Sequence, residues 1–104
     1  MATTIIVLFN LQDGVHIHEY EAWAKKTDLP VVRSLKSIDS FDVYKLTGML
    51  MGDGTPPYRY CEIIQVNDME TFGAEVSTEV MKKVAGEFRG FADNPLFITA
   101  AALA

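Results

Sequence analysis

Three charged side chains in this chain of 104 residues could move a proton or orient a ligand, namely Asp28, Arg33 and Glu62. Asp28 stands two residues before Pro30, at the expected C-terminal end of a helix, where the helix dipole disfavours a negative charge. A carboxylate there needs a compensating partner, and Arg33 is a candidate. Asp28 is therefore either an exposed residue that caps a turn or a general acid–base group in a partly desolvated pocket.

Glu62 interrupts an apolar strand pattern. Alternation places it on one strand face together with Tyr58, Tyr60, Ile64 and Val66. Such aromatic and aliphatic neighbours raise the pKa of a carboxyl group, so Glu62 could donate or accept a proton. The alternative is a salt bridge across a dimer interface or a place at the rim of a barrel. A register shift of one residue would put Cys61 in its position.

Aromatic residues are frequent enough to line a flat cavity. Such a cavity would suit pyrrole or other heteroaromatic ligands, which stack on aromatic rings. Each of these residues could equally belong to the core. The candidates for ligand binding are Phe9, Tyr20, Trp23, Tyr44 and Tyr60.

The sequence predicts neither a metal nor a cofactor. His16 and His18 form a His-x-His pair, but on a helix two side chains at this spacing point in different directions, and no cluster of further ligands lies nearby. Cys61 has no adjacent His that could activate it, so we interpret it as a buried strand residue.

A loop rich in glycine and proline occupies residues 48–57. It lacks the glycine patterns of nucleotide-binding sites, and it carries Met49 and Met51. We interpret it as a lid over the cavity.

Composition limits the classes of protein to consider. The length suits a single domain spanning residues 1–104, and 49% of the residues are hydrophobic, which is typical of a folded globule. The net charge of −5, with scattered basic residues, argues against nucleic-acid binding. A lone cysteine and the lack of any run long enough to cross a membrane favour a soluble cytoplasmic protein without a membrane partner.

Hydrophobic periodicity predicts four strands and two helices. The strands are expected over residues 3–11, 37–46, 58–66 and 96–103. In the second strand, Phe41 and Val43 are expected on one face and Ile38 and Tyr44 on the other. The first helix should begin at Asp13 or Gly14 and end near Asp28.

The second helix should follow a capping arrangement formed by Asn67 and Glu70. Its buried stripe is expected to consist of Phe72, Val76, Val80 and Val84. The resulting order, β-α-β-β-α-β, is that of an α+β, ferredoxin-like fold with one antiparallel four-stranded sheet and both helices on one face. Because the strands are apolar on both faces, we expect a second copy to cover the open face in a two-fold symmetric homodimer.

Three short stretches carry a resemblance to a known family. Tyr20-Glu21-Ala22-Trp23, the exit Thr27-Asp28-Leu29-Pro30 and the run from Arg33 to Ser37 resemble the dimeric α/β barrel superfamily. Within it, the chain is most similar to the REDY-like proteins of prodiginine pigment biosynthesis. The resemblance covers essentially the full length. It implies that two sheets form a barrel and that each subunit holds a small-molecule cavity between helices and sheet.

The resemblance also implies a function in secondary metabolism, on the bipyrrole branch of the red pigments. One possibility is a cofactor-independent enzyme that carries out a cyclisation or dehydration step on a pyrrole or bipyrrole intermediate. The alternatives are a non-catalytic protein that holds the intermediate for partner enzymes and a cofactor-free monooxygenase of the same fold. Many relatives carry His at the position of Asp28, so a mechanism based on that histidine does not transfer to this chain.

Overall fold

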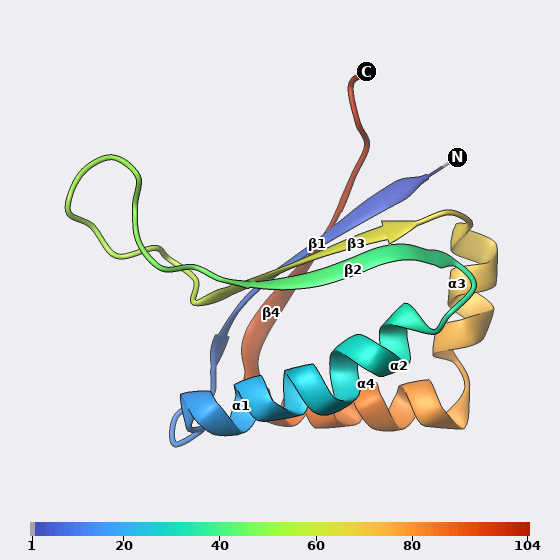
Figure 1. Cartoon of the computed structure of the whole chain (residues 1–104), viewed down its shortest axis with the longest axis horizontal. Helices are drawn as coiled ribbons and strands as arrows, with labels where there is room; N and C mark the ends of the chain where they lie inside the picture. Colours follow the sequence, from blue (N-terminus) through green and yellow to red (C-terminus); the bar gives the residue numbers. More distant parts are fainter. Residues whose placement is uncertain (1) are drawn as a thin grey trace.

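The computed structural model describes residues 2–104 and contains one antiparallel sheet with its helices on a single face (Figure 1). The strand order is β2-β3-β1-β4, which confirms the predicted ferredoxin-like α+β fold. The strands are β1 (Thr3–Leu11), β2 (Ile38–Lys45), β3 (Tyr60–Val66) and β4 (Ala92–Ala100). The helices are α1 (Ile17–Trp23), α2 (Leu29–Arg33), α3 (Met69–Val76) and α4 (Glu79–Phe91), with a π-helical turn η1 (Ala24–Asp28) joining α1 to α2.

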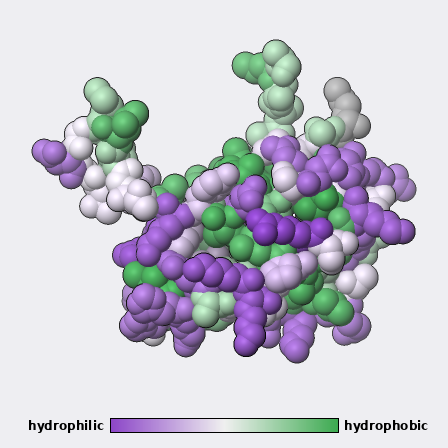
Figure 2. All heavy atoms as spheres, in the orientation of Figure 1, coloured by the Kyte–Doolittle hydropathy of each residue, from purple (hydrophilic) through white to green (hydrophobic). Residues whose placement is uncertain are grey.

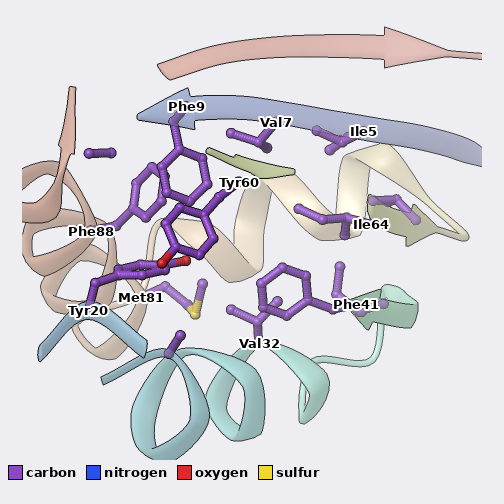
Figure 3. Close-up of a cluster of buried hydrophobic side chains, with 14 residues drawn as sticks. Ile5, Val7, Phe9, Tyr20, Val32, Phe41, Tyr60, Ile64, Met81 and Phe88 are labelled. Carbon is purple, nitrogen blue, oxygen red and sulfur yellow. The ribbon is translucent and has the colours of Figure 1, made fainter. Parts of the chain in front are cut away.

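The core lies between the sheet and the helices, and aromatic rings fill the end nearest α1 (Figure 3). The ring of Phe9 is stacked on Tyr60 at 5.5 Å between centroids and meets Tyr20 and Phe88 edge-on at 5.6 and 5.0 Å. Smaller aliphatic residues from β1, β3 and α2 continue the core toward β2. Through these rings, α1 and α4 both pack against the two central strands, β1 and β3.

The first helical segment does not end near Asp28, as predicted, but continues to Arg33. The N–H of Leu29 donates to the carbonyl of Ala24, five residues back, so the helix widens by one residue before Pro30. A proline in a regular helix loses one hydrogen bond and collides with the preceding turn, whereas in the first turn of α2 Pro30 is tolerated. The helix also begins later than predicted, at Ile17, because the side chain of His16 caps it.

Strand β2 contains an irregularity that changes the orientation of one residue. Ile38 pairs with Val66, but Ser40 pairs with Gln65, so Asp39 is an extra residue in the ladder. Ile38 is consequently buried on the same side as Phe41, and the prediction that they face opposite ways is wrong.

The second helical segment is split in two at Ser77 and Thr78. Asp68, and not Asn67, caps α3, and Thr78 caps α4. This break changes which residues of the helix face the sheet. Val80, which was expected to be buried, is 60% exposed, and Met81 is buried instead. The predicted stripe is thus correct for Val84 and wrong for Val80.

Removing the cap of α4 is expected to destabilise the fold moderately. The Thr78 side chain accepts a hydrogen bond from the Met81 N–H at 3.4 Å. Thr78→Ala should lower the free energy of unfolding by about 0.5–2 kcal/mol, measured by urea denaturation. Thr55→Ala, in the exposed loop, removes the same atoms without uncapping a helix. Equal losses in the two variants would contradict this role of Thr78.

The remaining boundaries differ from the prediction at β3 and β4. Strand β3 begins at Tyr60, two residues later than expected, and β4 begins at Ala92, four residues earlier. In β4 an irregularity lies opposite Phe9, where Asn94 has a positive φ of 42°. Among residues 2–104, no helix has the length and apolar character needed to cross a membrane.

Candidate active site

Two carboxyl groups from different layers of the fold face one cavity of about 270 Å³. Asp28 comes from the end of η1, and Glu62 comes from the middle of β3. Arg89 of α4 is the third charged residue of the described lining. The other lining residues are apolar: Val32, Phe41, Ile64, Phe72, Val76, Met81, Val84, Ala85, Phe88, Pro95 and Phe97. The cavity thus combines apolar walls with a pair of acids.

Both residues are only 5% exposed. Loss of hydration disfavours their charged forms, which raises the pKa of Asp28 to about 7. Burial, and secondarily the negative charge of Asp28, raises the pKa of Glu62 to about 8. Both pKa values are raised toward neutral pH, so the pair can hold one proton between the two carboxyl groups in that range.

A second polar cluster lies beside a smaller cavity of about 150 Å³ that is lined in part by Tyr20 and Tyr60. The Tyr60 hydroxyl donates to Glu21 Oε2 at 2.6 Å, and Lys45 Nζ lies 3.1 Å from the same oxygen. These contacts lower the pKa of Glu21. Sequence reasoning did not select Glu21 or Lys45, because neither stands in a pattern that would indicate burial.

Arg33 is not the partner of Asp28. Its guanidinium lies 3.0 Å from Asp42 Oδ1 and donates through Nε to the carbonyl of Phe41 at 2.9 Å. The side chain is half exposed and lies over the edge strand β2, because residues five apart on a helix point in different directions. The structure therefore does not bring Arg33 to Glu62 and Asp28.

The predicted aromatic residues are divided between several places. Tyr20 and Tyr60 border the smaller cavity, and Phe9 packs against both rings. Trp23 donates through Nε1 to Glu87 Oε1 at 3.0 Å and packs against Phe91. Tyr44 is 53% exposed and lies opposite Cys61 on the face of the sheet away from the helices.

Most of the cavity wall was not predicted from the sequence, because it depends on strand register and on the phase of α4. Phe97 pairs with Val7, and Val7 pairs with Glu62, so the three residues form one row across the sheet. Met81, Val84 and Phe88 follow the phase that Thr78 sets.

The predicted lid does not cover this cavity. The loop carrying Met49, Leu50 and Met51 extends beyond the end of the sheet (Figure 1). These three side chains are exposed, and hydrophobic and hydrophilic atoms lie next to one another on the loop (Figure 2). None of the described lining residues belongs to it. The expectation that Met49 and Met51 close the cavity is therefore wrong for the single chain.

The residues considered for metal or nucleophilic chemistry lie elsewhere. The rings of His16 and His18 are 5.3 Å apart, and His16 Nδ1 accepts from the His18 N–H. Within residues 2–104, no group of three or more His, Cys, Asp or Glu side chains could hold a metal ion. Cys61 is only partly buried on the open face, where desolvation raises the pKa of its thiol.

The open face of the sheet is apolar. Ile6 pairs with Ile63 on one side and Ile98 on the other, and Leu8 pairs with Leu96. Leu96 and Ile98 are 44% and 40% exposed. This surface is the one that the sequence predicts a second copy to cover.

The chain is similar to known proteins in sequence and in structure. The family model described as REDY-like protein HapK matches residues 3–103. The structure of HapK from Hahella chejuensis is similar, with 26% identity, a TM-score of 0.75, and coverage of 97% of this chain and 92% of that one. No protein with a curated function matches at a significant level.

Two further solved structures share the fold. Hydroxynitrile lyase from Passiflora edulis has a TM-score of 0.82 at 8% identity, with coverage of 99% of this chain and 95% of that one. A dimeric ferredoxin-like protein of unknown function from Thermobifida fusca has a TM-score of 0.74 at 14% identity, with coverage of 98% and 92%. These two likenesses support the ferredoxin-like architecture of a single chain.

Proposed function

Because the chain belongs to the HapK family of REDY-like proteins, we propose that it is a cofactor-independent enzyme of pigment biosynthesis in the cytoplasm. Its substrate is a pyrrole or bipyrrole intermediate of prodigiosin-type pigment assembly, and the step is a cyclisation or dehydration. The observation that carries this proposal is the pair of buried carboxyl groups, Asp28 and Glu62, in one apolar cavity. Family membership supports the pathway, and the acid pair supports the chemistry.

The two carboxyl groups can act as acid and base in a single dehydration. Glu62 gives its proton to the leaving hydroxyl group, the C–O bond breaks, and water departs. The Asp28 carboxylate takes a proton from the adjacent carbon, whose electron pair forms the new double bond. A proton then returns from Asp28 to Glu62 through water in the cavity, and both groups regain their starting states. The apolar walls hold the flat ring and exclude bulk water.

Deleting the gene in its host tests the pathway and the step together. We expect the deletion strain to accumulate one pyrrole-containing intermediate in place of pigment, and we expect the intact gene to restore the pigment. The mass of the accumulated compound identifies the step. A strain that still makes pigment at the wild-type level, with no new intermediate, would contradict the proposal.

A binding protein without catalytic activity is the second candidate, and the mainly apolar cavity wall favours it. Such a protein would hold the intermediate for other enzymes of the pathway. It should lose affinity for the intermediate when a larger side chain fills the cavity, and it should keep its function in Asp28→Asn and Glu62→Gln.

A third possibility is a cofactor-free monooxygenase. This function requires oxygen uptake in the presence of the intermediate, and a lack of uptake excludes it.

The functional unit is proposed to be a homodimer formed through the open face of the sheet. The row of Ile6, Ile63 and Ile98 supports this proposal because exposed apolar surfaces of this kind mark interfaces. The dimeric relative of similar fold is a further argument.

A charge in the centre of that face is expected to separate the subunits. Ile6→Lys would bury an unpaired charge, so the dimer dissociation constant should rise by roughly 100-fold or more, measured by sedimentation equilibrium. Val80→Lys introduces the same charge at an exposed position of α4 and should leave the dimer intact. A wild-type protein that sediments as a monomer would contradict the homodimer.

A further inference from the structure

Three buried side-chain atoms lack a hydrogen-bond partner among the described residues: Ser37 Oγ, the hydroxyl oxygen of Tyr20 and Oε2 of Glu62. Ser37 stands just before β2, whereas Tyr20 and Glu62 come from α1 and β3 and border the two cavities. Tyr20 is 0% exposed, so its hydroxyl cannot be satisfied by bulk water. Buried polar groups nearly always have a partner, which means that this pair requires an explanation.

These two atoms belong to the same neighbourhood. Tyr60 and Glu62 are buried on the same face of β3, two residues apart, and Tyr20 packs against the Tyr60 ring. After burial, the negative charge of Glu62 is the strongest cause of the raised pKa of Tyr20, ahead of Asp28 and Tyr60. The rings of Tyr20 and Tyr60 lie 4.8 Å apart between centroids, and their hydroxyl ends point toward one another (Figure 3). The Tyr60 hydroxyl, however, gives its proton to Glu21. Tyr20 is therefore the tyrosine that has a hydrogen available for another acceptor.

No group within residues 2–104 lowers the pKa of Glu62. Asp28, from η1, carries the same sign of charge and raises the pKa of Glu62. Arg89, from α4, lines the same cavity but is exposed. Tyr60 lies two residues away on the same strand and is hydrogen-bonded to Glu21. A neutral donor from α1, the Tyr20 hydroxyl, remains.

We infer that Tyr20 is a positioning residue for Glu62 and donates its hydroxyl hydrogen to Glu62 Oε2, directly or through one water, when Glu62 has released its proton. The inference deepens the proposed function, on which its consequence for catalysis rests. The bond would stabilise the carboxylate after proton donation and keep the carboxyl group from rotating away from the cavity. It would also provide a hydrogen-bond partner for both the Tyr20 hydroxyl and Glu62 Oε2.

The test is a carbon-13 NMR titration of the side-chain carboxyl groups in wild type, Tyr20→Phe and Tyr60→Phe. A hydrogen bond to a charged group lowers the pKa of a carboxyl, so its loss in Tyr20→Phe should raise the Glu62 midpoint by about one pH unit or more. Tyr60→Phe removes a hydroxyl from the adjacent ring. It should leave the Glu62 midpoint nearly unchanged and raise that of Glu21.

The outcomes separate this inference from the proposed function. A raised Glu62 midpoint in wild type that does not move in Tyr20→Phe would overturn the inference and leave the acid pair in place. A wild-type Glu62 that titrates at its ordinary value would contradict the acid pair itself. If Tyr20→Phe fails to fold, the hydroxyl proton of Tyr20 in the wild-type protein provides the second test. Its proton signal should shift sharply as Glu62 ionises, and a signal that stays constant would also overturn the inference.

Discussion

Glu62→Gln is expected to abolish pigment formation almost completely while the protein keeps its fold. The amide has nearly the same shape as the carboxyl group but cannot give up a proton, so the general acid is lost. General acid–base catalysis contributes about 10²–10⁴ in rate, and turnover should fall by a factor in this range. The measurement is pigment yield in the deletion strain carrying the variant, with expression checked in parallel.

Glu79→Gln is the matched control, because Glu79 lies in the first turn of α4 and does not line the cavity. It should restore wild-type pigment. Asp28→Asn should resemble Glu62→Gln, since the base and the acid act in the same step. Full pigment from a well-expressed Glu62→Gln variant would leave the binding function as the better explanation of the cavity.

Stability should decrease as the pH rises from about 5.5 to about 9, and Glu62→Gln should remove much of this decrease. The folded protein keeps the Glu62 proton up to a pKa of about 8, whereas the unfolded chain releases it near 4.5. Between these values the folded state binds more protons, so raising the pH favours unfolding. At about pH 9 the variant should be more stable than wild type by roughly 2–4 kcal/mol, measured by urea denaturation at both pH values.

Asp28 contributes in the same direction over a lower range, from its ordinary value of 3.8 to about 7. Carboxyl groups with a lowered pKa, such as Glu21 and Glu75, lose their stabilising contribution only at lower pH. The interval above about pH 5.5 therefore reports mainly on the buried pair. A wild-type protein that is equally stable at both ends of this interval would contradict the burial of ionisable acids in the core.

Alternation was sufficient to predict the strand face on which Glu62 lies, although it left open a place in the cavity or at the rim of a barrel. Strand β3 is regular over its whole length, so every second residue from Tyr60 to Val66 is buried. The same simple period identified the strands and the fold. Asp28 was harder to place, because Pro30 predicts a helix end, and an exposed helix end was one of its two interpretations. The π-helical turn, which local sequence does not specify, keeps the helix intact and leaves Asp28 buried in the cavity wall.

Features that depend on contacts between distant segments were out of reach of the sequence. Arg33 pairs with Asp42 because α2 crosses the edge strand β2. The hydrogen bond between Tyr60 and Glu21 joins residues 39 positions apart. The α4 part of the wall depends on the phase that the break at Thr78 imposes, and Phe97 depends on the register of β4. Each of these contacts can be predicted only when the tertiary arrangement of the segments is known.

Incubating the purified protein with the intermediate that the deletion strain accumulates tests the central claim most directly. The reaction is followed by mass spectrometry and an oxygen electrode, without other enzymes or added cofactors. We expect the wild-type protein to convert the intermediate without oxygen uptake, and we expect Glu62→Gln to leave the intermediate unconverted. An intermediate that binds to the wild-type protein and is recovered unchanged would contradict the claim that this protein is a catalyst.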